Sequence, residues 1–209
     1  MNNITFDTEG KSRAKKEDIE WLRFWCENTN DNGLPRVALI GDSITEGYFR
    51  LAQKALENVA LVDYLATSYS IDSAAYLAMV KAFIADSDYA AVHYNYGLHA
   101  YSVDDDTYER RCFEMLNFIC ARTKAVVGLS TTVLMPDLQT ESAGWKDKVI
   151  ARNKRLEKLA RELGLPVDDL YSVSKKLYGE NRTADGVHFS ENGSADLAAS
   201  VVESLKNIL

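Results

Sequence analysis

The chain has 209 residues, 46% of them hydrophobic, and a formal net charge of −7 at pH 7. This length suits one well-buried core, so we expect a single domain over residues 1–209, with residues 1–35 as an N-terminal extension that contains one helix. The acidic balance argues against a nucleic-acid partner, because such binding depends on clustered Lys and Arg. No stretch approaches the ~20 apolar residues of a membrane span.

The N-terminal residues and the cysteines indicate a reducing compartment. The first ten residues are polar and include two carboxylates, unlike a cationic and apolar secretory signal, so we expect a cytoplasmic protein. The cysteines, Cys26, Cys112 and Cys120, are odd in number and lack the paired spacing of metal ligands. We therefore expect reduced cysteines in the core and no metal site.

Helix-like and strand-like segments alternate along the chain. Apolar residues recur at helical spacing from Asp18 to Cys26, which predicts an amphipathic helix ahead of the first strand. The strands expected after it are Val37 to Ile40, Val59 to Leu65, Tyr89 to Asn95, Ala125 to Val133 and Val167 to Tyr171. The helices expected between and after them are Phe49 to Leu56, Ser73 to Ala85, Asp105 to Ala121, Trp145 to Leu163 and Glu191 to Leu205.

This alternation predicts an α/β fold, a flavodoxin-like three-layer α/β/α sandwich with a mainly parallel five-stranded sheet. Ligands of such sheets bind outside the carboxyl ends of the strands. Ser43 follows the first of these strands and Asn95 ends the third, so both should lie at that edge. The segment from Leu134 to Gly144 predicts a substantial loop that overlooks the same edge.

Ser43, Asp185 and His188 are the groups that acyl transfer requires. A serine hydroxyl is a weak nucleophile at neutral pH, so it needs an imidazole to take its proton and a carboxylate to orient that imidazole. Gly41 permits a sharp turn before Ser43, and Gly47 permits a close approach one helical turn later. Alternatively, Ser43 caps a helix and His188 is structural; the two segments together favour catalysis.

Three blocks of the chain resemble those of the SGNH, or GDSL-type, hydrolase superfamily of esterases and lipases. They are Gly41-Asp42-Ser43-Ile44, the segment His93 to His99 around Asn95, and Asp185-Gly186-Val187-His188. The resemblance extends from Arg36 to the C-terminal helix. It implies that Ser43 is the nucleophile, that His188 is general base and then acid, and that Asp185 fixes the tautomer of His188. It also implies an oxyanion hole formed by Asn95 and the Ser43 backbone, and no cofactor.

The chain departs from the family pattern in two places. The second block normally supplies a glycine N–H after the second strand, but Thr67 to Ser73 contains no glycine. A backbone N–H needs no particular side chain, so Ser70 is our candidate for this oxyanion donor. In the third block, Tyr96 stands where an aspartate usually follows the asparagine.

Three further residues are candidate substrate contacts: Asp42, Tyr96 and His99. For His99 the alternative is an aromatic wall made by its tyrosine neighbours, Tyr94, Tyr96 and Tyr101. Such aromatic faces stack on sugar rings or on apolar acyl groups.

The sequence thus predicts a serine ester hydrolase that forms an acyl-enzyme on a small acyl ester. Acetylated carbohydrates are favoured by analogy with other members of the superfamily. Two alternatives stay open. One is a catalytically impaired domain of the same fold that binds a glycan or another ligand, and the other is a lysophospholipase or thioesterase. A homo-oligomer is also left open.

Overall fold

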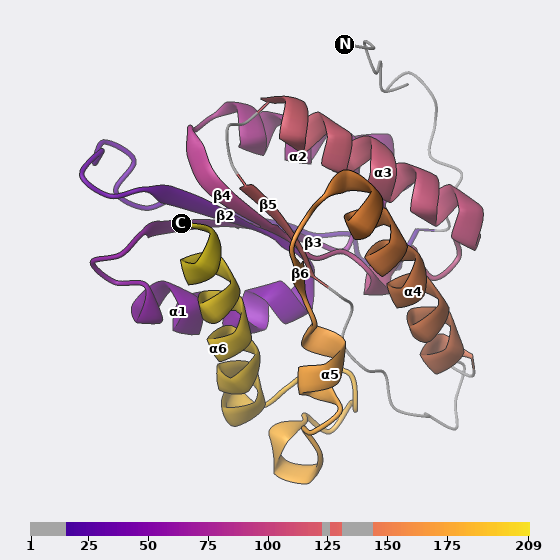
Figure 1. The fold of residues 1–209 in the computed structure, drawn as a ribbon. Helices are drawn as coiled ribbons and strands as arrows, with labels where there is room; N and C mark the ends of the chain where they lie inside the picture. Colours follow the sequence, from indigo (N-terminus) through magenta and orange to yellow (C-terminus); the bar gives the residue numbers. More distant parts are fainter. Residues whose placement is uncertain (1–15, 123–125, 131–143) are drawn as a thin grey trace.

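A six-stranded sheet lies between two layers of helices (Figure 1). The computed structural model describes residues 16–122, 126–130 and 144–209, and in these parts the strand order is β1-β3-β2-β4-β5-β6. The strands are β1 (Leu22–Trp25), β2 (Arg36–Gly41), β3 (Leu61–Thr67), β4 (Tyr89–Tyr94), β5 (Val126–Ser130) and β6 (Val167–Asp168). Strands β2 to β6 are parallel, whereas β1 pairs with β3 in the antiparallel sense.

The helices are divided between the two faces of the sheet. They are α1 (Ser43–Ala55), α2 (Ala74–Ala85), α3 (Asp105–Arg122), α4 (Trp145–Leu163), α5 (Leu170–Ser174) and α6 (Glu191–Ile208). Buried residues of α2, α3 and the second half of α4 form one apolar layer with the sheet. Those of α1, α5 and α6, together with Val149 near the start of α4, form the other. None of the helices in the described parts is long and apolar enough to cross a bilayer.

The predicted fold class, a three-layer α/β sandwich with a mainly parallel sheet, is confirmed. The prediction of a helix from Asp18 to Cys26 is wrong, because this segment contains β1. With β1 the sheet has six strands, one more than predicted. Residues 22–25 of the N-terminal extension therefore belong to the sheet. The apolar residues of this segment recur at helical spacing, but pairing with β3 decides the local structure. Local periodicity carries no information about a partner strand that is distant in the sequence.

The α1 helix begins at Ser43, six residues before the predicted start at Phe49. The side chain of Asp42 accepts a hydrogen bond from the Ile44 N–H, which is the usual N-cap arrangement. Ser73 caps α2 in the same way through the N–H of Ala75, as predicted. The last predicted strand is shorter than expected, because Asp169 caps α5 directly after β6.

The cysteines differ in burial. Cys112 is buried, Cys26 is partly buried and Cys120 is exposed, so the prediction of a core position is wrong for Cys120. Eight residues along a helix rotate a side chain by about 80°, which is enough to move it off the buried face. Both ends of the predicted fourth strand, residue 125 and residues 131–133, lie outside the described residues, as do residues 134–143 of the predicted loop.

Candidate active site

Ser43 stands on a tight turn at the carboxyl end of β2. A Cβ atom on Gly41 would lie 1.9 Å from Thr45 Oγ1 and 3.0 Å from the Asn95 carbonyl oxygen, so only glycine fits there. A Cβ atom on Gly47 would lie 3.5 Å from Ser194 Oγ, which is an ordinary contact. The close approach predicted at Gly47 is therefore not needed by the protein itself.

The structure joins the three residues of the predicted triad in one hydrogen-bonded series. His188 Nε2 lies 2.8 Å from Ser43 Oγ, and His188 Nδ1 lies 2.6 Å from Asp185 Oδ2. With the ring proton on Nδ1, the imidazole donates to Asp185 and accepts from the Ser43 hydroxyl. The side chains of His188 and Asp185 are 42% and 49% exposed, so the series is open to an external ligand.

Asp185 builds the turn that presents His188. Its Oδ1 accepts hydrogen bonds from the backbone N–H groups of Val187, at 2.8 Å, and His188, at 3.0 Å, and from the Thr183 hydroxyl, at 2.7 Å. Gly186 adopts a left-handed conformation, with φ of +71°, which glycine adopts without strain. One carboxylate oxygen therefore organises the turn and leaves the other for the imidazole.

The electrostatics of Asp185 keep it ionised. Partial burial raises the pKa of this carboxyl group, but the hydrogen bonds from the side chain and backbone of His188, from Thr183 and from Val187 outweigh it. The pKa of Asp185 consequently falls below its ordinary range. A permanent carboxylate is what an orienting partner of an imidazole requires.

Arg182 supports this turn and was missed by sequence reasoning. Its guanidinium donates to the carbonyl oxygens of Gly186 and Val187, at 3.2 Å each. The same guanidinium lies over the Phe189 ring. These bonds fix the two peptide groups that link Gly186 to Val187 and Val187 to His188. No sequence signal marks the role, because the acceptors are backbone carbonyls whose positions depend on the folded turn.

The topology brings Asn95 and Ser70 to the same edge as Ser43. Asn95 follows β4 and Ser70 follows β3, the two strands that flank β2 in the sheet. The Asn95 N–H donates to the Ile40 carbonyl at 2.8 Å, so the residue extends the pairing with β2 up to the Ser43 turn. The Asn95 side chain lies beside the Tyr48 hydroxyl. This hydroxyl also contacts Thr45 Oγ1 at 3.0 Å.

Two of the three predicted substrate contacts are buried. Asp42 is 2% exposed and caps α1, so its carboxylate is already used within the protein. Tyr96 is 1% exposed and packs against Tyr76, with a ring-centroid distance of 4.4 Å. Its hydroxyl has no hydrogen-bond partner among the described residues. Both residues lie beneath the edge that carries Ser43 and do not form its surface.

His99 lies nearer the surface and contacts the N-terminal segment. Its Nδ1 is 2.5 Å from Glu17 Oε1, and its ring meets the Trp21 ring edge-on. The alternative aromatic wall is reduced to Tyr101, which is exposed and stacks on Trp145. Sequence reasoning missed Glu17 and Trp21, because they are about 80 residues from His99 in the chain.

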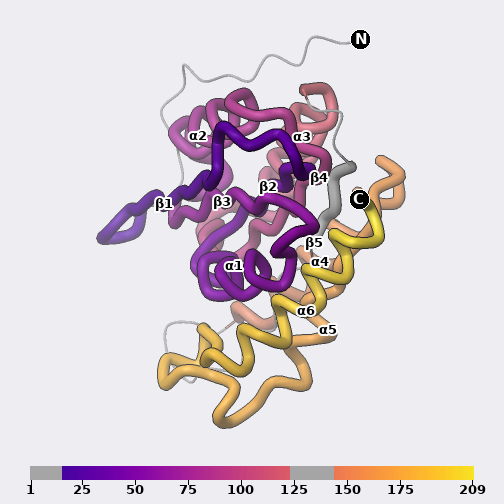
Figure 2. Tube along the Cα trace, turned by 90° about the vertical axis from the view of Figure 1, so that its left-hand side faces the viewer, coloured from indigo at the N-terminus to yellow at the C-terminus, as the bar shows by residue number. Residues whose placement is uncertain are grey.

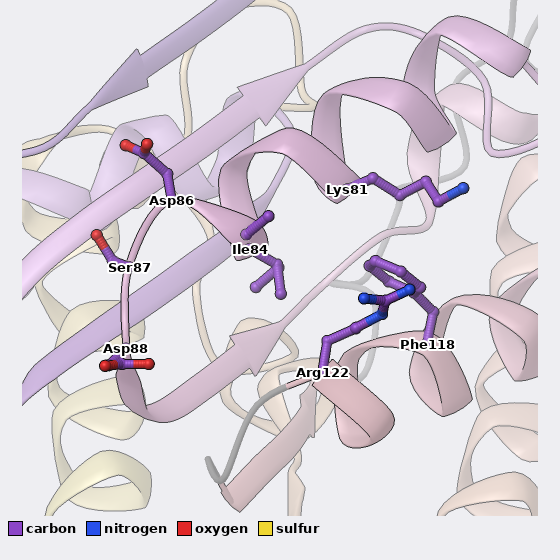
Figure 3. A pocket seen from close by; sticks show the side chains of 8 residues that line it. Lys81, Ile84, Asp86, Ser87, Asp88, Phe118 and Arg122 are labelled. Carbon is purple, nitrogen blue, oxygen red and sulfur yellow. The ribbon is translucent and has the colours of Figure 1, made fainter. Parts of the chain in front are cut away.

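A hollow of about 570 Å³ lies at the other edge of the sheet. It is lined by Lys81, Phe118 and Arg122 on one side and by Asp86 and Asp88 on the other (Figure 3). Asp88 directly precedes β4, so this hollow lies at the amino ends of the parallel strands and is separate from Ser43. Across residues 16–122, 126–130 and 144–209, no three His, Cys, Asp or Glu side chains are grouped as metal ligands would be.

Several solved structures share the fold of this chain. No protein-family model matches the sequence, and no curated protein is significantly similar to it. Among solved structures, the acetyl xylan esterase AlAXEase is 18% identical, with a TM-score of 0.67, over 81% of this chain and 99% of its own. A GDSL-like lipase from Bacteroides thetaiotaomicron is 19% identical, with a TM-score of 0.68, over 83% and 89%.

A third similar structure is that of a variant of Axe2, an acetyl xylan esterase from Geobacillus stearothermophilus. It is 16% identical, with a TM-score of 0.69, and covers 82% of this chain and 94% of its own. At these identities the likeness establishes the fold. The chain therefore has the fold of the SGNH hydrolases, as its sequence blocks predict.

Proposed function

We propose that the chain is a serine ester hydrolase that works through an acyl-enzyme. The observation that carries the proposal is the unbroken series from Ser43 Oγ through the His188 imidazole to Asp185, at 2.8 and 2.6 Å. The three residues come from two segments about 145 positions apart. A helix cap or a structural histidine would need no such alignment, so the geometry favours acyl transfer over a binding domain that has lost its chemistry.

The geometry supports the usual order of proton transfers. As Ser43 Oγ attacks the ester carbonyl carbon, His188 Nε2 takes the hydroxyl proton, and Asp185 stabilises the resulting imidazolium. The imidazolium then gives this proton to the departing alcohol, which leaves an acyl group on Ser43. Water, deprotonated by the same nitrogen, attacks the acyl carbon and releases the acid, and Ser43 regains its proton.

The oxyanion would be held at the amino end of α1. Ser43 is the first residue of this helix, where backbone N–H groups and the helix dipole favour negative charge. The amide of Asn95 and a backbone N–H in the turn after β3, with Ser70 as our candidate, supply donors from the two flanking strands. One such donor is worth about 3 kcal/mol of transition-state stabilisation.

The substrate we propose is a small acyl ester, with an acetylated carbohydrate as the first choice. Support comes from two of the similar structures, which are acetyl xylan esterases. The similarity to a GDSL-like lipase keeps longer acyl esters as the alternative. The proposed mechanism uses protein side chains, backbone N–H groups and water.

Hydrolysis of p-nitrophenyl acetate by the wild type, Ser43→Ala and Ser87→Ala tests the proposal. Ser87 lies at the amino edge of the sheet and is the matched control. We expect Ser43→Ala to lower kcat by at least about 1000-fold and Ser87→Ala to leave it unchanged. A fluorophosphonate probe should modify Ser43 in the wild type. Equal rates for the wild type and Ser43→Ala would disprove the assignment of the nucleophile.

A second assay separates the substrate classes. Acetylated xylooligosaccharides and p-nitrophenyl esters of increasing acyl length are compared by kcat/KM. Preference for the acetylated sugars supports the carbohydrate proposal, and a preference for long acyl chains supports the lipase-like alternative.

A further inference from the structure

The N-terminal segment Glu17–Arg23, called the N-terminal strap below, crosses the edge of the sheet that carries Ser43. It leads into β1, which lies beside β3 at the border of the sheet (Figure 2). Its last two residues, Leu22 and Arg23, already belong to β1. The strap contacts Glu46 in the first turn of α1, Ser68 after β3 and His99 after β4. These three elements follow the neighbouring strands β2, β3 and β4, so the strap joins all the parts that meet around Ser43.

The strap makes its densest contacts with the turn after β3. The Trp21 N–H donates to Ser68 Oγ at 2.8 Å, and the Ser68 hydroxyl donates to Glu20 Oε2 at 2.9 Å. The Trp21 carbonyl accepts from the Ser68 N–H at 3.2 Å and from the Thr67 hydroxyl at 2.6 Å. Ser68 is 1% exposed, so these bonds are largely shielded from water.

Glu20 fixes the orientation of the Ser68 hydroxyl in this set of hydrogen bonds. A hydroxyl can rotate, but a carboxylate only accepts, so Glu20 fixes the Ser68 proton toward itself and leaves the lone pairs for Trp21. Hydrogen bonds to an ionised group are about twice as strong as neutral ones. The other carboxylate oxygen, Oε1, accepts from the Glu17 N–H at 3.2 Å, which holds Glu20 in place.

The far end of the same turn is also fixed. The Ser73 N–H donates to the Ser70 carbonyl at 2.8 Å, and Ser73 caps α2. Ser70 therefore lies between an anchor on the strap and an anchor on a helix. The segment from Thr67 to Ser73 has no glycine, and these two anchors hold its conformation together with an ion pair between Asp72 and Arg111 at 3.1 Å.

We infer that Glu20 is a positioning residue for the oxyanion hole. It acts through Ser68 to hold the turn after β3, so that a backbone N–H near Ser70 points toward the oxyanion formed at Ser43. A donor already in place costs no reorganisation during the reaction, which is what makes such a site effective. This inference rests on the proposed esterase activity, because it assigns a task in that reaction.

Kinetics with p-nitrophenyl acetate test the inference with four variants: Glu20→Ala, Glu20→Gln, Ser68→Ala and Arg23→Ala. Loss of positioning should lower kcat by about 10- to 100-fold in Glu20→Ala and Ser68→Ala with little change in KM, less than the loss of a whole donor. Glu20→Gln keeps an acceptor for the Ser68 hydroxyl and should recover most of kcat. Arg23→Ala removes a solvent-accessible ion pair with Glu46 and a ring contact with Trp21, but no hydrogen bond to Ser68, so it should keep the wild-type kcat.

The double variant Glu20→Ala/Ser68→Ala should be no slower than the slower single variant, because both substitutions remove one shared contact. The thermal unfolding midpoint of each variant confirms that the compared proteins are folded at the assay temperature. A wild-type kcat in Glu20→Ala, or the same loss in Arg23→Ala as in Glu20→Ala, overturns the inference and leaves the proposed function intact. A wild type without Ser43-dependent hydrolysis overturns both.

Discussion

Replacing Gly41 by alanine should damage both the stability and the activity of the protein. The new methyl carbon would lie 1.9 Å from Thr45 Oγ1, 2.8 Å from Thr45 Cβ and 3.0 Å from the Asn95 carbonyl oxygen. Comfortable separations between such atoms are about 3.5 Å, so the Thr45 side chain would have to move by more than 1 Å. Thr45 is fully buried and bonded to the Tyr48 hydroxyl, so it has no free space to enter.

Overpacking of this kind costs about 1–3 kcal/mol in the free energy of unfolding. Gly41 is two residues from Ser43 and lies against the backbone of Asn95, so the same shift displaces both the proposed nucleophile and a proposed oxyanion donor. A displacement of about 1 Å at a reacting group can lower the rate about 100-fold. The assays are urea unfolding followed by fluorescence, and kcat/KM for p-nitrophenyl acetate.

Gly47→Ala is the matched control, since it adds the same methyl group six residues later. Its Cβ would find only an ordinary contact with Ser194 Oγ at 3.5 Å, and alanine is favoured over glycine within a helix by about 1 kcal/mol. We expect this variant to be at least as stable as the wild type. Gly41→Ala with wild-type stability and wild-type kcat/KM would refute the reasoning about the turn.

Three further predictions concern groups on and around the site. Hydrogen bonds that include one from the His188 side chain lower the pKa of Asp185 in the folded protein. The Asp185 charge therefore stabilises the fold fully above the ordinary aspartate pKa, and this stabilisation is lost as the pH falls through the lower pKa of the folded state. NMR titration of the carboxyl group should show this pKa rising in His188→Ala, and an unchanged value would contradict the assignment. Arg152 is buried and donates to the Ala100 and Val103 carbonyls at 2.8 Å each, so Arg152→Ala should lower the free energy of unfolding in urea by about 3 kcal/mol; a loss below 1 kcal/mol would contradict this. Burial raises the pKa of the Cys112 thiol to about 12, so mass spectrometry after native thiol labelling should find Cys120 modified and Cys112 unmodified, and equal labelling would count against the packing described.

The parts of the fold that local pattern decides were predicted well. The run from Val37 to Ile40 is buried at every position, and an uninterrupted apolar run of that length is typical of an internal parallel strand. The positions of Ser43 and Asn95 at one edge of the sheet follow from the alternation of strands and helices. The contact between His188 and Asp185 was also accessible, because one short turn builds it.

The features that depend on distant partners could not be predicted from the sequence. Every residue of Leu22–Trp25 is exposed, so the strand has no burial pattern, and pairing with β3 defines it. The link between Glu20 and Ser68 joins residues 48 positions apart. The sequence predicts Tyr96 as a candidate substrate contact, but the turn after β4 directs its ring into the core. Such outcomes depend on backbone geometry that residue types alone do not specify.

The order in which the chain is made affects when Ser43 can react. Ser43 begins α1, whereas His188 lies three residues before α6, a helix that packs directly against α1. During synthesis, β2, α1 and the turn after β3 leave the ribosome well before the segment that holds the imidazole. A nascent or C-terminally truncated chain therefore carries an ordinary serine alcohol. Under the proposed mechanism, reactivity of Ser43 therefore reports the docking of the last helix, and the reaction is confined to chains that have completed this non-local step of folding.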